Sequence, residues 1–268
     1  MSIVPMTSRK ARPKPLVLSI AGFDPSSGAG ITADIKTIAA HGCYGVTCIT
    51  ALTVQSTRGV AMVEPVENRI ITETLEALIA DRPIAAVKIG MLGSAEAARA
   101  VAAFLKRHEP EHVVLDPILR SSSGADLITK EGLPVLKEKL LPRSSVITPN
   151  IDEAAALTGM EVGNPEQMKS AALRLHEMGA RIVIITGGHL DPPVDLISPG
   201  RGKPVLCLEG RKIITTSTHG TGCAFSTSLA CNLACGKSLV EAVRGAKRYV
   251  EAALEKAPRL AAAAGPVV

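Results

Sequence analysis

The sequence predicts an α/β protein with a mostly parallel central sheet. Short apolar runs alternate with stretches of helical periodicity from residue 16 to about residue 256, the pattern of repeated β-α-β units. The hydrophobic fraction is 46% but aromatic residues make up only 2%, so the core must be packed from Ala, Val, Ile and Leu. That composition is typical of helices layered on a buried parallel sheet. No linker interrupts the alternation, and we expect one domain over residues 16–258, between a disordered basic tail at 1–15 and an alanine-rich tail at 259–268.

The expected elements follow one another along the chain. Ile31, Ile35 and Ile38 recur on one face and predict a helix there, and amphipathic patterns predict the others. Apolar runs bounded by polar residues or glycines predict the strands. The strands are expected at 16–22, 46–54, 85–89, 112–115, 145–148 and 182–186, and the helices at 28–41, 67–80, 95–107, 130–140, 151–158, 166–178, 223–235 and 238–257.

One segment breaks this alternation. Between residues 189 and 212, prolines and glycines flank short apolar stretches. Proline cannot donate to a strand ladder and is confined to edges and turns. We therefore expect a hairpin or an irregular excursion at an edge of the sheet.

Bulk composition narrows the classes of function. The net charge of +5 is modest, and no basic stripe carries the aromatic residues that stack on bases, so we expect no nucleic-acid partner. The sequence has no signal-peptide apolar region and no apolar run long enough to cross a bilayer, so we expect no membrane partner. The six cysteines include no CxxC pair, and Cys231 and Cys235 are interpreted as buried small hydrophobic residues rather than metal ligands. A cytoplasmic protein with reduced thiols is expected.

The motif Thr-His-Gly-Thr-Gly-Cys at residues 218–223 is the most informative about chemistry. It opens an apolar helix, so its glycines are expected to let the backbone approach a bound anion, toward which the amides at the helix start point. The positive end of the helix dipole is expected to lower the pKa of the Cys223 thiol. This arrangement suits phosphoryl transfer, in which loop amides hold the phosphate and one side chain activates the acceptor hydroxyl. For the motif alone, a glycine-rich turn with a buried cysteine remains the alternative.

Other candidate residues follow predicted strands, where an open α/β sheet binds ligands. Asp24 lies in a loop that either contacts a small molecule or simply caps a tight turn. Asp34, one turn into the next helix, is expected to point at a ligand or to lie on a solvated face. Gln55 offers both donors and an acceptor to a ring edge, or is an ordinary surface residue. Met91 either flanks a planar ligand or fills the core.

Acidic residues follow two further strands. Asp116 ends one strand, and Asn150 and Glu153 are three residues apart at a helix start. The pair fits a capped N-terminus; with Asp116 it also fits a site for hydrated Mg²⁺ between nucleotide phosphates. The segment Thr-Gly-Gly-His from Thr186 accommodates a nucleotide or only turns the chain. All these residues are expected on the same rim of the sheet.

Six segments together resemble the hydroxymethylpyrimidine/phosphomethylpyrimidine kinases of thiamine biosynthesis, a branch of the ribokinase family. The resemblance covers residues 16 to 256. It is carried by Ser-Ile-Ala-Gly-Phe-Asp-Pro-Ser-Ser-Gly-Ala-Gly at 19–30, Ile-Thr-Ala-Leu-Thr-Val-Gln at 49–55, Lys-Ile-Gly-Met-Leu at 88–92, Thr-Pro-Asn-Ile-Asp-Glu at 148–153, Gly-Gly-His at 187–189 and His-Gly-Thr-Gly-Cys at 219–223.

The resemblance implies a three-layer αβα sandwich of the ribokinase type and two successive ATP-dependent phosphorylations. The first converts 4-amino-5-hydroxymethyl-2-methylpyrimidine to its monophosphate, and the second forms the diphosphate. ATP and Mg²⁺ are the implied cofactors, the pyrimidine and its phosphate the implied small-molecule substrates, and a homodimer the implied assembly.

The resemblance also implies roles for individual residues. Cys223 would be the catalytic base, at a position where most ribokinase relatives carry an aspartate. The remaining implied roles are pyrimidine binding by Gly22, Ala29, Asp34, Gln55, Met91 and Ile118, nucleotide binding by Asn150, Thr186, Gly188, Gly220 and Gly222, an anion hole at Gly220, Thr221 and Gly222, and Mg²⁺ binding by Asp116 and Glu153.

Two departures from the family pattern remove positive charge expected near the nucleotide phosphates. Thr186 and Ser122 stand where the family often has lysines. We expect Arg120, Mg²⁺ and the loop amides to compensate in part. Two alternatives stay open. One is a pyridoxal or pyridoxine kinase, whose substrate is also a flat heteroaromatic bearing a hydroxymethyl group. The other is a non-catalytic pyrimidine sensor, which the lost lysines favour and the retained Glu153, Cys223 and glycine loop disfavour.

Overall fold

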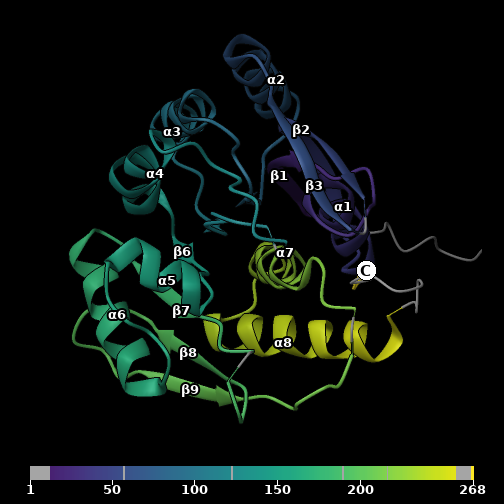
Figure 1. The fold of residues 1–268 in the computed structure, drawn as a ribbon. Helices are drawn as coiled ribbons and strands as arrows, with labels where there is room; N and C mark the ends of the chain where they lie inside the picture. Colours follow the sequence, from purple (N-terminus) through teal and green to yellow (C-terminus); the bar gives the residue numbers. More distant parts are fainter. Residues whose placement is uncertain (1–12, 57, 122, 189, 216, 258–266) are drawn as a thin grey trace, which may run out of the picture.

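The computed structural model describes residues 13–56, 58–121, 123–188, 190–215, 217–257 and 267–268. Within these residues, nine strands form one sheet in the order β3-β2-β1-β4-β5-β6-β7-β8-β9. The pairs from β2 through β1 and β4 to β7 are parallel, and the pairs β2–β3, β7–β8 and β8–β9 are antiparallel. The predicted α/β class with a mostly parallel sheet is confirmed (Figure 1).

The elements of the first half of the chain match the predicted alternation closely. They are β1 (Leu16–Phe23), α1 (Gly30–Ala40), β2 (Tyr44–Ser56), β3 (Gly59–Pro65), α2 (Asn68–Asp81), β4 (Ala86–Ile89), α3 (Ala95–His108) and β5 (Val113–Leu115). Strand β3 is the addition. It pairs antiparallel with β2 at the edge of the sheet, and its exposed Met62 gives it no continuous buried run by which the sequence would reveal it.

The second half contains one correction and one confirmed expectation. Its elements are α4 (Gly132–Val135), the π-helix η1 (Leu136–Leu140), the 3₁₀-helix η2 (Leu141–Arg143), β6 (Val146–Ile147), α5 (Ile151–Thr158), α6 (Pro165–Glu177), β7 (Ile182–Ile185), β8 (Val194–Ser198), β9 (Leu206–Glu209), α7 (Thr221–Ala234) and α8 (Leu239–Lys256). The single helix predicted at 130–140 is wrong: the segment changes helix type, and Pro142 has no amide hydrogen with which to extend α-helical bonding. The edge hairpin expected near 189–212 is present as β8 and β9.

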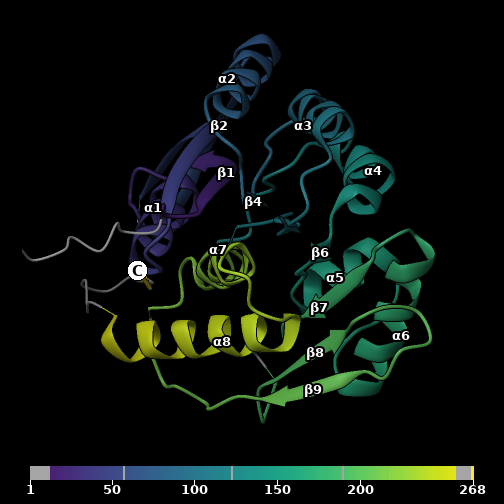
Figure 2. The same ribbon diagram turned by 180° about the vertical axis from the view of Figure 1, so that it is seen from behind.

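Helices cover both faces of the sheet, which gives the three layers that the resemblance implied (Figures 1 and 2). One core packs α2 to α6 against one face, and its fully buried members include Leu75, Val101 and Leu175. The other packs α1, α7 and α8 against the opposite face, around Ile38, Leu229 and Ala246. Because α1 and α7 begin at the same rim of the sheet, the second core lies directly below the candidate site.

Some expectations fall on residues that the structure does not describe. Both predicted tails lie almost wholly outside the described residues, at 1–12 and 258–266, and so the domain boundaries stay predictions. All six cysteines are free thiols. Cys231 is buried as expected, but the expectation of a buried Cys235 is wrong because this residue ends α7 and is exposed. Among the described helices, none combines the length and apolarity that a membrane crossing needs. The cytoplasmic location stays a prediction.

Candidate active site

The candidate residues converge because parallel strands end at one rim of the sheet. The loops that follow β1, β4, β5, β6 and β7 all leave this rim, and the loop before α7 returns to it (Figure 2). In an open α/β sheet this rim is where ligands bind. Side-chain contacts connect the loop before α7 to the loop after β1 and to β2.

The glycine motif forms a tight N-terminus for α7. Gly220 is its N-cap in the left-handed region, at φ 84°, and a Cβ there would lie 1.8 Å from the Gly28 carbonyl oxygen. The loop after β1 and the loop before α7 are therefore in backbone contact, which only glycine permits. The amides of the first helical turn lack intrahelical partners and favour an anion at the exposed Gly222.

Asp24 organises the loop after β1. Its carboxylate accepts hydrogen bonds from the Ser26 amide (2.8 Å), the Ser26 hydroxyl (2.7 Å) and the Ala29 amide (2.9 Å). His219 Nε2 lies 2.8 Å from Asp24 Oδ2. Burial alone would raise the pKa of Asp24, but the hydrogen bonds from His219 and Ser26 outweigh it and lower the pKa. Asp24 is thus more than a cap, because its carboxylate contacts both His219 of the glycine motif and the Ala29 amide in the loop after β1.

The predicted pyrimidine-binding residues fall beside these two loops. The side-chain nitrogen of Gln55 lies 3.2 Å from His219 Nε2, and the Thr53 hydroxyl donates to Gln55 Oε1 (3.1 Å). Met91 and Ile118 pack in one small apolar cluster with Ala51, between β2–β3 and the strand ends. A Cβ at Gly22 would lie 2.8 Å from the Met91 sulfur, so this glycine makes room for Met91. Their contacts with a ligand stay predictions.

Asp34 does not lie on a solvated face, and that interpretation is wrong. Its side chain is 0% exposed and forms an ion pair with Lys88 Nζ, at 3.0 Å from Oδ1 and 2.9 Å from Oδ2. The hydroxyls of Thr227 (2.7 Å, to Oδ1) and Ser19 (2.5 Å, to Oδ2) fill the remaining lone-pair positions. A direct contact of Asp34 with substrate stays a prediction, and here the protein already saturates its oxygens.

Asp116 lies beside the first turn of α7, and Glu153 is close enough to Asp116 to feel its charge. Asp116 accepts a hydrogen bond from Ser226 Oγ (2.9 Å), and a Cβ on Gly222 would lie 3.8 Å from Asp116 Oδ2. Burial raises the pKa of Asp116 to about 6. Burial, and then the charge of Asp116, raises the pKa of Glu153 to about 8. The two carboxyls are close enough to interact, and the positive charge of Lys88 offsets only part of the rise in the pKa of Asp116.

Asn150 and Glu153 form the capping box expected of them. Glu153 Oε2 accepts from the Asn150 amide (2.9 Å), and Asn150 Oδ1 accepts from the Glu153 amide (2.8 Å). Asn150 also forms an isolated bridge with Thr186, so two of the predicted nucleotide-binding residues are adjacent. Gly188 follows as an exposed residue. Roles for Asn150, Thr186 and Gly188 toward a nucleotide stay predictions.

Cys223 occupies the third position of α7, and its thiol is buried. The expectation that the helix dipole lowers its pKa is wrong: burial dominates and raises the pKa of the thiol to about 12. The positive charge of Lys88 and a hydrogen bond from the Gly30 amide act in the opposite direction, and the charges of Asp34 and Asp116 add to the rise. Lys88 and His219 are contributors that sequence reasoning missed. A lysine inside the apolar strand Ala-Val-Lys-Ile was the available signal for the first.

The structure describes Thr186 and Arg120, but not Ser122, among the residues that bear on the departures from the family pattern. Arg120 forms an ion pair with Asp126 (2.9 Å) and its side chain is mostly exposed, so its charge is already matched. Ser122 lies outside the described residues.

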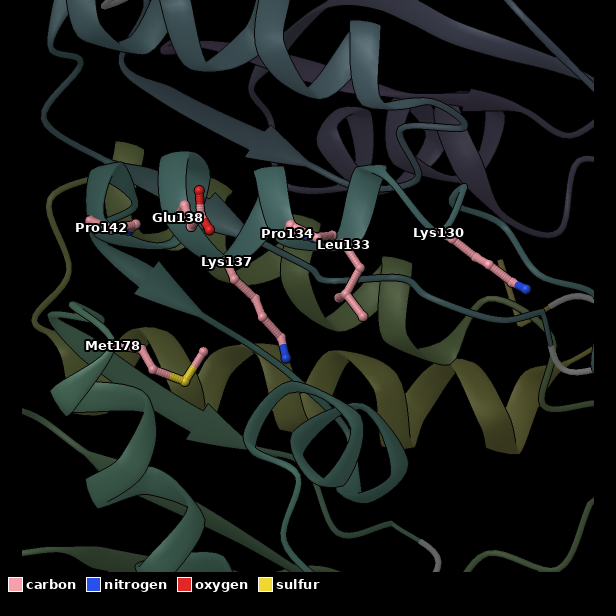
Figure 3. Close-up of a pocket in the computed structure, with 7 residues that line it drawn as sticks. All are labelled: Lys130, Leu133, Pro134, Lys137, Glu138, Pro142 and Met178. Atoms are coloured by element: carbon pink, nitrogen blue, oxygen red, sulfur yellow. The ribbon is translucent and has the colours of Figure 1, made fainter.

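Two cavities, of about 580 Å³ and about 220 Å³, are lined by none of the predicted site residues. The larger one lies between the α4 segment and Met178, with Lys130 and Lys137 at its wall (Figure 3).

Fold and site together define a ribokinase-like α/β protein: a mostly parallel sheet in three layers, with a glycine-rich loop and two acids at one rim. The family model described as phosphomethylpyrimidine kinase matches residues 24–268. The chain therefore belongs to the phosphomethylpyrimidine kinase family.

Two relatives illustrate the similarity in sequence. The chain is 39% identical over 247 residues to the hydroxymethylpyrimidine/phosphomethylpyrimidine kinase of Aquifex aeolicus, covering 91% of this chain and 96% of that one. It is 43% identical over 257 residues to the thiamine biosynthesis bifunctional protein ThiED of Geobacter sulfurreducens, covering 95% of this chain. The chain spans about half (52%) of that bifunctional relative.

Two solved structures illustrate the similarity in fold. The phosphomethylpyrimidine kinase of Clostridium difficile superposes with a TM-score of 0.80 at 38% identity, covering 90% of this chain and 100% of that one. An ADP complex of Bacillus subtilis pyridoxal kinase superposes with a TM-score of 0.87 at 33% identity, covering 94% and 96%. The ribokinase-like fold is thus shared with kinases named for two different heteroaromatic substrates.

Proposed function

We propose that this protein phosphorylates 4-amino-5-hydroxymethyl-2-methylpyrimidine with ATP and then phosphorylates the monophosphate to the diphosphate. One observation carries the proposal: 39% identity across 91% of the chain to a relative of matching length that bears this activity in its name. The site supports it, because the glycine loop contacts Gln55 through His219 and Asp116 through Ser226. A planar alcohol and a nucleotide phosphate would meet at the start of α7.

The chemistry follows from the residues at that point. The acceptor hydroxyl oxygen forms a bond to the γ-phosphorus, the bond from that phosphorus to the β–γ bridging oxygen breaks, and ADP leaves. The amides of Gly220, Thr221 and Gly222 hold the phosphate charge. We propose that the thiolate of Cys223 takes the hydroxyl proton. In the second step the acceptor is a phosphate oxygen, which at neutral pH has little need of a base.

We propose Asp116 and Glu153 as the residues that serve Mg²⁺. Burial raises the pKa values of these carboxyls to about 6 and about 8, and a divalent cation would stabilise their ionised forms. Within the described part of the chain, no group of three or more His, Cys, Asp or Glu side chains forms a cage for a metal ion. That fits Mg²⁺, which is commonly held by one or two carboxylates together with waters and substrate phosphates. When bound, Mg²⁺ would neutralise phosphate charge.

A pyridoxal kinase is the second candidate, favoured by the TM-score of 0.87 to the pyridoxal kinase of Bacillus subtilis. A substrate panel decides between the two. Purified protein is supplied with Mg²⁺-ATP and with hydroxymethylpyrimidine, its monophosphate, pyridoxal or ribose, and product mass is measured. Mono- and diphosphate products from the pyrimidine support the proposal. Turnover of pyridoxal alone supports the second candidate, and binding of the pyrimidine without ATP consumption identifies a sensor.

We further propose a homodimer built on the β2–β3 edge. Leu52, Val54 and Met62 are about half exposed, at 49%, 54% and 53%. Val54 and Met62 are register partners in the antiparallel pair, and Leu52 lies two residues from Val54 on the same face. An apolar sheet face of this kind is a poor surface to leave in water, and a second copy would cover it.

A further inference from the structure

The buried ion pair of Lys88 and Asp34 lies below the reactive end of α7. Lys88 is on β4, beside Ser19 in the register of β1 and β4. Its side chain is 0% exposed. A Cβ on Gly90 would lie 2.8 Å from Lys88 Nζ, so the lysine extends along the strand toward the rim, over a residue that has no side chain to obstruct it. The ammonium is thus brought toward the candidate site and not away from it.

Two successive contacts between α1 and α7 place this pair relative to Cys223. The Gly30 amide, at the start of α1, lies near the Cys223 sulfur and lowers the pKa of the thiol. Four residues further along each helix, Asp34 accepts from the Thr227 hydroxyl (2.7 Å). Residues four apart lie one turn apart on the same helix face. Lys88 and Asp34 therefore sit one helical turn below the thiol, on the face of α7 that the thiol shares.

The charges that face Cys223 come from three elements. Lys88 on β4 is the positive one, and Asp34 on α1 and Asp116 after β5 are negative. Burial alone would lower the pKa of Lys88, but the charges of Asp34, Cys223 and Asp116 together overcome it and raise the pKa, so the lysine is charged at neutral pH. In a water-poor interior such a charge acts on its neighbours with little screening.

We propose that Lys88 is a positioning residue of this kinase, whose buried ammonium is fixed by Asp34 one turn below Cys223 and favours the thiolate there. The inference rests on the proposed function, in which Cys223 takes the hydroxyl proton. The interior cation offsets part of the effect of burial, which disfavours the thiolate. Asp34 then acts chiefly by holding the lysine in place.

The test measures the thiol without any substrate. Iodoacetamide alkylation of Cys223 is followed by peptide mass mapping in wild type, Lys88→Met, Asp34→Asn and a control, Lys169→Met. The control removes the same charge from the exposed surface of α6. We expect Lys88→Met to be alkylated about tenfold more slowly at fixed pH, which corresponds to about one pKa unit. Asp34→Asn keeps one acceptor oxygen for Lys88 and removes a negative charge that raises the pKa of the thiol, so it is expected to be alkylated at the wild-type rate or faster. Lys169→Met is expected to be alkylated at the wild-type rate.

The sign of the change separates an electrostatic role from a structural one. Breaking a buried ion pair loosens the packing, and loosening exposes the thiol and accelerates alkylation. Alkylation of Lys88→Met at or above the wild-type rate would therefore overturn the proposal. If Lys88→Met does not fold, the double variant Lys88→Met/Asp34→Asn is compared with Asp34→Asn alone. The proposal then requires that the double variant be alkylated more slowly than Asp34→Asn. Because no kinase activity enters this measurement, failure of the proposed function appears separately, in the substrate panel.

Discussion

At the scale of single residues, the site is governed by buried charge. Cys223, Asp116 and Glu153 all have pKa values raised by burial, each in the direction that disfavours the ion. Perturbed groups of this kind gather at functional sites, because ligands and neighbouring charges supply what the solvent does not. Two consequences follow, one for turnover and one for stability.

Cys223→Ala is expected to lower kcat for the first phosphorylation by about 10²–10⁴-fold, the range for a general base. Pyrimidine binding should be nearly unchanged, because the thiol acts on the proton in transfer. Steady-state kinetics and calorimetric binding check this. Cys231→Ala is the matched control, since it removes a buried thiol two turns further along the same helix. Wild-type turnover in Cys223→Ala would remove the thiol from the mechanism.

Glu153 should make the metal-free protein less stable as pH rises. Its folded pKa of about 8 lies above its usual value of 4.5, so the folded state binds a proton that the unfolded state has released. The contribution of this group to the free energy of unfolding is therefore largest below about pH 4.5. It falls as the pH rises to about 8, by about 1.4 kcal/mol for each pH unit in that interval.

Urea unfolding across that range compares wild type with Glu153→Gln, which keeps an acceptor for the Asn150 amide. In the variant, the free energy of unfolding is expected to fall less steeply with rising pH than in wild type. Glu161→Gln, at an exposed position beyond the end of the same helix, should behave like wild type. Identical slopes in wild type and Glu153→Gln would contradict the raised pKa.

At the scale of elements, the first turn of α7 depends on its contact with the loop after β1. The contact is made by backbone at Gly220 and Gly28 and by side chains at His219 and Asp24. Two loops far apart in sequence are thereby held as one wall of the site. A change that separates them should affect catalysis more than stability.

Gly220→Ala is expected to displace this wall. The added Cβ would meet the Gly28 oxygen at 1.8 Å, and φ of 84° is strained for alanine, at a cost of about 1–3 kcal/mol. Because a displacement of about 1 Å in an active site can cost about 100-fold in rate, kcat should fall by at least about tenfold. Kinetics and thermal melting measure both effects. Gly163→Ala, where the nearest atom is Gln167 Oε1 at 3.5 Å, serves as control. Normal turnover in Gly220→Ala would show that the loop contact is dispensable.

At the scale of the whole molecule, the sheet has two antiparallel edges of different character. At one edge the outer strand β9 exposes Leu206, whereas the β2–β3 edge exposes Leu52, Val54 and Met62 near the predicted pyrimidine site. The second edge is thus where assembly and substrate binding would meet.

Val54→Glu/Met62→Glu is expected to convert the proposed dimer into a monomer. Two carboxylates on this face would have to be buried without partners on association. As exposed positions they should change the stability of the monomer by only about 0.5 kcal/mol. Analytical ultracentrifugation of wild type and variant measures the oligomeric state of each. A wild-type monomer, or a variant that remains dimeric, would place the interface elsewhere.

The sequence by itself determined the alternation of strands and helices and the rim on which the motifs gather. Hydrophobic periodicity and strand-end glycines are local signals, and parallel strands necessarily end together. It also made Cys223, Glu153 and the glycine loop candidates, through their places at predicted strand ends and through the family resemblance. Only the tertiary structure decided what surrounds them. The burial that raises the thiol pKa, the saturation of Asp34 and the pairing of Lys88 depend on separate elements of the chain, since dielectric and charge at a site come from neighbours in space.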